Sequence, residues 1–491
     1  MHFTFKRFVR HMLGTLFAMG LVVSPTESSG GQSWWAKAAK PYQGTILRGI
    51  SENTPPSQYV RDVLAKQFER ETGIKVELEL SDWGTMYDKS TQDMATGKGV
   101  YDFVYIEQDI FYAYLAQKFL ANLTVILRGH PGLGSPLFHF SDFTSFLDYF
   151  ADPGTRDMYG VPMEGFLKVY LFRKDLFETP KIQQAFKKKY GYPLKPATTL
   201  KAYHDIAEFF THWAKGKGID MWGATVQARL DHPSSFYEVV ETLFPMFGVY
   251  NWGINTDTWK ASVKGGGKLN SKRAKEAFTY WLDLLKYAPP EAKDSDWGDV
   301  ARSFAAGRVA QGWVYGDNMG WLTADPKRSK VIGRVGVALP PLHEGVLEEA
   351  RAGKGYIGYY DGGAFGIPQS SKHKEAALLW LQFIGQPAVQ KQWTVQSVRV
   401  VHNATLGDPS VKAQDAITGG YYSFLSQYGS LYSGAPPFSF HGAVRDIIAP
   451  YIHKAIRGDL SPADALDQAA ARIDQRLARL VKKGLLTKKE R

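Results

Sequence analysis

The chain has 491 residues, a formal net charge of +11 and no cysteine. This length exceeds what one hydrophobic core usually serves, so we expect two large lobes. The lack of cysteine excludes disulfides, thiolate nucleophiles, cysteine-bound zinc, iron–sulfur clusters and a lipid-modified N-terminal cysteine.

The positive charge is concentrated at the two ends of the chain. Residues 1–38 carry a net charge of +3 and residues 472–491 carry +6, which leaves +2 for the rest. Nucleic-acid binding needs a basic face on a folded unit, and this distribution does not provide one. We therefore expect no nucleic-acid partner.

The N-terminal segment has the pattern of an export signal. Lys6, Arg7 and Arg10 precede an apolar run over residues 12–23, which is shorter than a membrane span needs. We expect a signal peptide over 1–38, cleaved after Ala38 or nearer residues 24–30, and a soluble periplasmic protein. An uncleaved interfacial anchor is the alternative.

The next segments alternate between predicted strands and helices. Residues 68–78 predict a helix, a tight turn at Gly73 and a strand, because glycine readily adopts the positive φ of a helix end. This alternation favours α/β lobes. Strands are predicted over 46–50, 74–80, 102–106, 159–162, 168–172, 307–314, 335–339 and 363–367. Helices are predicted over 58–71, 83–96, 110–116, 199–215, 271–287, 372–384 and 461–482.

Several short motifs follow one another in a characteristic order. They lie at 68–76 (FERETGIKV), 101–109 (YDFVYIEQD), 119–124, 159–177, 304–310 and 362–384. In this order they resemble the family 1 extracellular solute-binding proteins, the receptors of carbohydrate ABC importers. Phe119, Asn122 and Arg173 depart from the family pattern.

The resemblance implies an α/β fold of the periplasmic-binding-protein type II, with two lobes, a three-segment hinge and a ligand cleft between the lobes. It implies a monomeric receptor that captures a carbohydrate or polyol, closes around it and delivers it to an ABC permease, without a cofactor, a metal or enzyme activity. The expected crossovers are 163–170, 340–346 and 399–404. The expected lobes are 40–163 plus 346–400, and 168–340 plus 402–491.

Sugar recognition needs aromatic faces for C–H groups and carboxylates or amides for hydroxyls. Such side chains follow the first three predicted strands, at the sheet edge where α/β proteins bind ligands. The candidates there are Glu52, Asn53, Trp83, Glu107 and Asp109. The resemblance assigns ligand binding to Asp109 in particular.

Further candidates lie at the predicted crossovers and in the second lobe. Each also has a structural interpretation, such as core packing for Trp222 and hinge support for Glu164 and Arg399. These candidates are Glu164, Phe166, Trp222, Tyr315, Asp317, Asn318, Asp361, Gly363 and Arg399. Segments 127–150 and 421–437 are expected to cap the cleft and favour a small ligand.

Two alternatives remain open. A secreted carbohydrate-active hydrolase would use a carboxylate pair such as Asp109 and Glu164. A sugar-phosphate receptor would need a cationic side chain in the cleft, for which Arg229 and Arg399 are the candidates.

Overall fold

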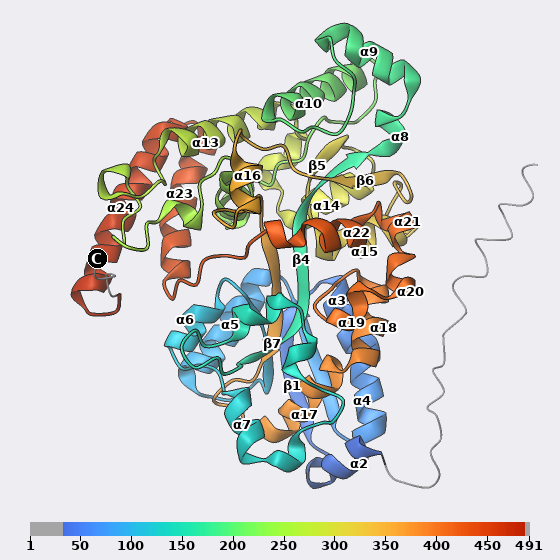
Figure 1. Ribbon diagram of the computed structural model, residues 1–491, viewed down its shortest axis with the longest axis vertical. Coiled ribbons are helices and arrows are strands. Elements are labelled where there is room, and N and C mark those ends of the chain that lie inside the picture. Colours follow the sequence, from blue (N-terminus) through green and yellow to red (C-terminus); the bar gives the residue numbers. More distant parts are fainter. Residues whose placement is uncertain (1–32, 487–491) are drawn as a thin grey trace, which may run out of the picture.

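The computed structural model describes residues 33–486, and its two lobes lie one above the other in Figure 1. Most of the expected signal peptide, residues 1–32, lies outside the described residues. Among residues 33–486, no helix combines the length with the apolar composition that crossing a bilayer requires.

The lower lobe in Figure 1 is built on strands in the order β2-β1-β3-β7. Strand β1 is parallel to β2 and β3, whereas β7 is antiparallel to β3. Phe68 packs against the rings of Trp380 and Phe383 and so joins α4 to α17. The strands are β1 (Ile46–Glu52), β2 (Lys75–Ser81), β3 (Phe103–Glu107) and β7 (Tyr360–Gly366). The helices are α2 (Trp34–Ala38), α3 (Pro55–Tyr59), α4 (Ala65–Thr72), α5 (Trp83–Thr96), α6 (Phe111–Ala116), α7 (Leu123–Gly129), α17 (Lys374–Gly385) and α18 (Pro387–Ser397).

One strand, β4 (Gly160–Arg173), runs from the lower lobe into the upper lobe. Its first half pairs with β7, and its second half pairs with β5 and β6. The sequence predicted two strands here, separated by a crossover at 163–170. That prediction was wrong about the break, because residues 164–167 stay paired with β7 and keep the strand continuous.

The upper lobe has apolar side chains on both faces of its sheet. Val169 and Leu171 pack into one core cluster, whereas Tyr170 and Trp313 point into another, as the two-residue period of a strand requires. Its strands are β4, β5 (Gln311–Tyr315) and β6 (Val335–Ala338). Its longer helices are α9 (Pro180–Tyr190), α10 (Leu200–Lys215), α13 (Lys272–Leu284), α14 (Trp297–Ala305), α23 (His441–Arg457) and α24 (Pro462–Lys482).

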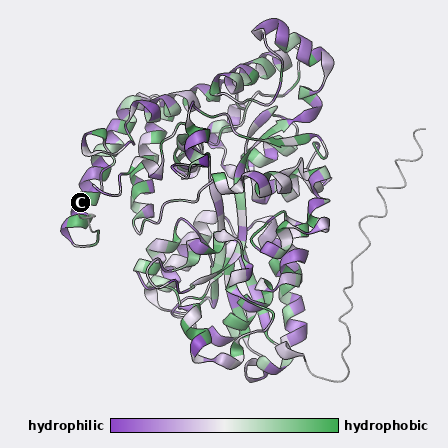
Figure 2. Cartoon of the chain, viewed as in Figure 1, coloured by the Kyte–Doolittle hydropathy of each residue, from purple (hydrophilic) through white to green (hydrophobic). Residues whose placement is uncertain are grey.

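The shorter helices of the upper half complete the packing around this sheet. Hydrophilic and hydrophobic residues alternate along the outer helices in Figure 2, as expected for helices with one face on a core. The short helices are α8 (Lys174–Phe177), α11 (Ser234–Phe236), α12 (Phe244–Met246), α15 (Met319–Ala324), α16 (Val346–Arg351), α19 (Asn403–Leu406), α20 (Pro409–Lys412), α21 (Asp415–Thr418) and α22 (Tyr421–Tyr428).

The second passage between the lobes differs from the expected 340–346. Val346, Ala350 and Ile357 pack with the core of the upper lobe, so the segment around them belongs there. The chain returns to the lower lobe along β7, which pairs with the whole first half of β4. In the third passage, Val400 packs in the upper core and Val401 in the lower one.

The first described helix bears on where the signal peptide ends. Trp35 is buried and packs edge-on against Phe383 of α17, with 5.3 Å between ring centroids. Cleavage after Ala38 would remove this tryptophan from the lower core. Of the two expected sites, the packing therefore favours the one nearer residues 24–30.

Candidate functional site

A pocket lies between the two lobes, where strand ends of the lower lobe face helices of the upper lobe. In this closed arrangement its cavity volume is about 30 Å³, the space of roughly one water molecule. A solute can therefore enter only when the lobes move apart. The lining residues are Glu52, Trp83, Tyr105, Glu107, Glu164, Phe166, Tyr237, Trp297, Tyr315, Asp317 and Asp361.

The lower wall is made by the ends of neighbouring strands. Glu52 ends β1, Glu107 ends β3, and Trp83 begins α5 directly after its N-cap residue Asp82. The carboxyl ends of parallel strands share one sheet edge, which brings these side chains together. The indole Nε1 of Trp83 donates a 2.7 Å hydrogen bond to Oε2 of Glu107.

A β-bulge and two glycines shape the hinge side of the pocket. The register of β4 against β7 shifts between Pro162 and Glu164, and such bulges re-aim side chains. Gly362 has φ +131°, and a Cβ there would lie 2.2 Å from the carbonyl oxygen of Glu164. A Cβ on Gly363 would lie 2.4 Å from the Tyr105 ring. Gly363 thus supports the pocket wall without lining it.

Aromatic side chains dominate the upper wall. Trp297 is the first residue of α14, where Asp296 and Asp299 form a capping box. Its Nε1 donates to Oε1 of Glu52 across the lobes at 3.2 Å, and its ring meets Trp83 edge-on at 6.2 Å. These contacts hold the two walls together in a closed arrangement.

The pocket brings together five carboxyl groups without a cationic partner. Within residues 33–486, none of Glu52, Glu107, Glu164, Asp317 and Asp361 forms an ion pair with Lys, Arg or His. Their known donors are neutral, such as the two indoles and, for Asp317, the amide of Asn318 at 2.9 Å.

Burial raises the pKa values of all five groups, and repulsion by neighbouring carboxylates adds to it for all but Asp317. Burial, reinforced by the charge of Asp317, raises the pKa of Glu52 to about 8. Burial raises the pKa of Asp317 to about 7. Burial and neighbouring carboxylates hold the pKa values of Glu107, Glu164 and Asp361 well above their usual range. Any group that brings positive charge or hydrogen bonds here would relieve this repulsion.

Asp109 differs from these five because its Oδ2 contacts a hydroxyl and an imidazole of the upper lobe, while its Oδ1 has no hydrogen-bond partner among the described residues. Its Oδ2 accepts a 2.9 Å hydrogen bond from the Tyr237 hydroxyl and lies 2.9 Å from Nε2 of His441. Burial acts to raise the pKa of Asp109, but His441 and Tyr237 outweigh it and hold the pKa below its usual value. We call Asp109, Tyr237 and His441 the latch, because Asp109 belongs to the lower lobe and the other two to the upper lobe.

The other predicted site residues that do not line the pocket have structural contacts. Asn53 accepts a hydrogen bond from Gln58 at the surface, and Trp222 forms a backbone bridge to Val309. Asn318 donates to Asp317 behind the wall. Arg399 is buried, with its guanidinium 3.8 Å from the centroid of Trp393.

Three lining residues escaped the sequence analysis: Tyr105, Tyr237 and Trp297. Tyr105 lies inside β3 rather than at its end, and Tyr237 lies in a helical segment without a strand-end signal. For Trp297 a signal existed, since Asp296 and Asp299 mark a helix start.

The segments 127–150 and 421–437, expected to cap the cleft, contribute no residue to the lining of this pocket. They meet each other elsewhere: the amide of Gly434 donates a 2.7 Å hydrogen bond to the Tyr149 hydroxyl, beside a separate hollow. The expectation that they restrict ligand size is therefore not supported by their position.

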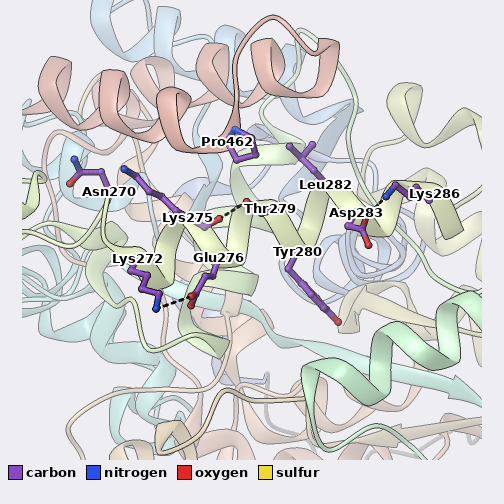
Figure 3. Close-up of a pocket in the computed structure, with 10 residues that line it drawn as sticks. All are labelled: Asn270, Lys272, Lys275, Glu276, Thr279, Tyr280, Leu282, Asp283, Lys286 and Pro462. Carbon is purple, nitrogen blue, oxygen red and sulfur yellow. Dashed lines mark hydrogen bonds and ion pairs between the residues drawn. The ribbon is translucent and has the colours of Figure 1, made fainter. Parts of the chain in front are cut away.

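A larger hollow, of about 1000 Å³, lies along the surface of α13. Figure 3 shows that its side chains come almost entirely from this one helix, with Pro462 of α24 beside them. It has one wall and its charged groups are paired, as between Lys275 and Asp467. Within residues 33–486, no group of three or more His, Asp or Glu residues is placed to hold a metal ion.

Comparison with known proteins agrees with the two-lobed architecture. A maltose-bound MalE3 of T. maritima superimposes with a TM-score of 0.71 at 19% identity, covering 88% of this chain and 100% of that one. A ribitol-bound ABC transporter solute-binding protein of Agrobacterium radiobacter K84 gives 0.68 at 20% identity, covering 88% and 99%. A D-mannitol-bound one of Agrobacterium vitis S4 gives 0.68 at 19%, covering 90% and 99%.

The fold is thus that of the type II periplasmic binding proteins. A family model described as "Bacterial extracellular solute-binding protein" matches residues 51–391, which is more than half of the chain. The chain belongs to the family of bacterial extracellular solute-binding proteins.

Proposed function

We propose that this protein captures a carbohydrate or polyol in the interlobe pocket and delivers it to an ABC permease. The observation that carries the proposal is the combination of five hydrogen-bonding carboxyl groups with six aromatic side chains in one enclosed space. Carboxyl groups form hydrogen bonds with the hydroxyls of a sugar or polyol, and aromatic rings pack against its C–H faces. The neighbours that bind ribitol, D-mannitol and maltose support the same class.

An anionic sugar phosphate fits this site poorly. The lining contains no Lys, Arg or His. Arg229, one of the two candidates, is half-exposed and pairs with Asp296, while Arg399 is stacked on Trp393. The carboxyl groups would repel a phosphate, so a neutral or positively charged solute is favoured.

A hydrolytic role is also disfavoured by the contacts of Asp109. The hydrolase alternative needs Asp109 and Glu164 as a free pair. Asp109 is buried and bound to Tyr237 and His441, so it is not available to attack or to activate water. We therefore propose a receptor without enzyme activity, without a cofactor and active as a monomer.

The interlobe contacts provide a means of signalling the bound state. The latch and the Trp297–Glu52 hydrogen bond form only when the lobes are together. A solute that bridges both walls would stabilise this closed form, which a permease could distinguish from the open one. The N-terminal signal pattern supports a periplasmic location for the mature chain.

The test is a thermal-shift screen of the mature protein against sugars, polyols and their phosphates, followed by calorimetry. A solute that binds only the folded protein at 100 times its Kd adds about 2.7 kcal/mol of stability. We expect a shift with a neutral or amino-substituted member, one-to-one binding and no product. A shift only with phosphates, or turnover of a glycoside, would contradict the proposal.

A further inference from the structure

The charge balance of the pocket is the feature that the proposed function leaves unexplained. A neutral polyol needs hydrogen-bond partners, which amides and hydroxyls provide at lower cost than buried carboxylates. Here the lining polar groups are five carboxyl groups, three tyrosines and two tryptophans, without one amide side chain.

One of the carboxyl groups has an oxygen left without a partner. Glu164 is 2% exposed, lines the pocket, and its Oε2 has no hydrogen-bond partner among the described residues. A buried carboxyl oxygen without a partner is costly, above all in the charged form, and burial accordingly raises the pKa of Glu164. Glu164 lines the pocket beside the β-bulge, where a bound molecule could supply the missing donor.

None of the cations near the pocket lines it. Lys168 forms a fully buried ion pair with Glu238 at 2.9 Å, and Arg445 pairs with Asp446. His441 lies against Asp109 in the latch. Arg399, whose charge acts to lower the pKa of Glu164, donates through Nη2 to Gln390, while its Nε and Nη1 have no hydrogen-bond partner among the described residues. These groups lie behind the walls and leave the lining itself acidic.

The aromatic residues suit a positive charge as well as a sugar face. Lys168 Nζ lies 4.5 Å from the centroid of Tyr315, and the Arg445 guanidinium lies 5.3 Å from that of Trp83. Two rings of the pocket thus already attract protein cations, a contact worth roughly 0.5–2 kcal/mol. A protonated amine in the pocket would meet both ring faces and carboxylates.

We infer that the solute carries at least one protonated amine, as an amino sugar or amino polyol does, and that Glu164 is one of its partners. This inference rests on the proposed function and narrows its substrate class. The ammonium group would donate a hydrogen bond to the unpartnered Oε2 of Glu164. Its positive charge would also reduce the repulsion among the carboxyl groups of the pocket.

The test uses matched pairs that differ in one amine. Calorimetry compares 1-amino-1-deoxy-D-glucitol with D-glucitol, D-glucosamine with D-glucose, and includes 1,4-diaminobutane as a diamine without hydroxyls. We expect the amine of at least one pair to bind at least about tenfold more tightly than its neutral partner, since hydrogen bonds between charged groups are about twice as strong as neutral ones.

Proton release gives a second readout. Glu52 and Asp317, with pKa values of about 8 and about 7, are partly protonated at pH 7. An ammonium group would displace protons from them, on the order of one per bound solute by linkage. Calorimetry at pH 7 in phosphate and in HEPES, whose ionisation enthalpies differ, measures this number. Release of no proton on binding of an amine would count against the inference.

A variant and a matched control assign the effect to the pocket. Glu164→Gln removes the unpartnered charge, and we expect it to weaken the amine about tenfold while changing the neutral partner little. Glu276→Gln removes the same charge from the exposed face of α13 and should change neither. If Glu164→Gln fails to fold, Glu107→Gln replaces it.

The outcomes separate the inference from the proposed function. Equal or tighter binding of the neutral partners would overturn the inference and leave the proposed function standing. Binding of 1,4-diaminobutane without any hydroxylated compound would support the charge requirement and contradict the carbohydrate proposal. No binding across the set would overturn both.

Discussion

Glu107 and Asp109 lie two residues apart at the end of β3, the first half-buried and the second buried, and they have opposite electrostatics. Glu107 receives one neutral indole donor, and burial raises its pKa well above the usual range. Asp109 accepts a hydrogen bond from the Tyr237 hydroxyl and lies beside the His441 imidazole. These two groups hold its pKa below the usual value despite burial. One side chain belongs to the pocket and the other to the latch.

In this protein, the contacts of a shielded carboxyl group determine whether its pKa is raised or lowered, and burial alone does not. A group with its partners supplied by the opposite lobe stabilises the closed arrangement by itself. A carboxyl group without such partners destabilises the closed arrangement until a bound molecule supplies them. Substitutions in the two regions should therefore act with opposite sign on stability.

The largest effect is expected at the latch. Asp109→Asn removes a buried carboxylate that accepts from Tyr237 and faces Nε2 of His441, and disrupting buried polar contacts of this kind costs about 1–3 kcal/mol. We expect a lower thermal midpoint and a larger radius of gyration by X-ray scattering. Tyr237→Phe, which removes one hydrogen bond, should cost about 1 kcal/mol. An unchanged midpoint in Asp109→Asn would contradict the assignment of the latch.

The second effect has the opposite sign and lies in the pocket. Glu107→Gln removes repulsion with Asp109 and Asp361 while keeping an acceptor for Trp83. We expect the solute-free protein to gain about 1 kcal/mol in stability and to lose roughly tenfold or more in solute affinity. Chemical unfolding and calorimetry measure the two quantities on the same preparation. Loss of both stability and affinity would show that Glu107 is structural.

The pH dependence separates the two regions without a substitution. The pKa of Glu52 is about 8 in the folded protein against an ordinary 4.5, so its favourable contribution is full below 4.5 and is lost as pH rises toward 8. The contribution of Asp109 is present above its ordinary 3.8 and is lost only at lower pH. We expect the thermal midpoint to fall between pH 7 and pH 9.

Glu52→Gln should flatten that fall, because it removes one of the titrating groups. The chosen range lies above the titration of the buried His232, His402 and His453, whose pKa values are lowered by burial. A midpoint that rises from pH 7 to pH 9 in the wild-type protein would contradict the raised pKa values of the pocket.

The smallest effect is expected next to Glu52. Asn53 bonds Gln58 on the surface and does not line the pocket. Asn53→Ala should therefore change solute affinity by less than about twofold and stability by less than about 0.5 kcal/mol. A large loss of affinity in the calorimeter would place the solute further toward the surface than the pocket described.

The site residues that could be found from the sequence are those that directly follow a predicted strand. Glu52, Trp83 and Glu107 were predicted because each follows a recognisable strand, and all three line the pocket. Position after a strand could not separate Asp109 from Glu107, because the partners of Asp109, Tyr237 and His441, are more than 100 residues away in the chain. Such contacts are set by lobe closure, which local sequence does not encode.

In the fold, too, elements set by neighbouring residues were predicted correctly, and an element that depends on pairing with a distant strand was not. The bounds of α5 match the predicted 83–96, since Asp82 caps one end and Gly97, in a left-handed conformation, the other. The continuity of β4 through the hinge was not predicted, because Glu164 and Gly165 are weak strand formers. They stay in the strand only through pairing with Gly362 and Gly363 of β7.

The most direct test of the account is a crystal structure with the solute that the screen identifies. The account predicts that the solute lies between the lobes, touches Trp83, Glu107 and Glu164, and leaves Asp109 bound to Tyr237 and His441. A solute bound directly to Asp109 with the latch broken, or one seated in the hollow along α13, would contradict it.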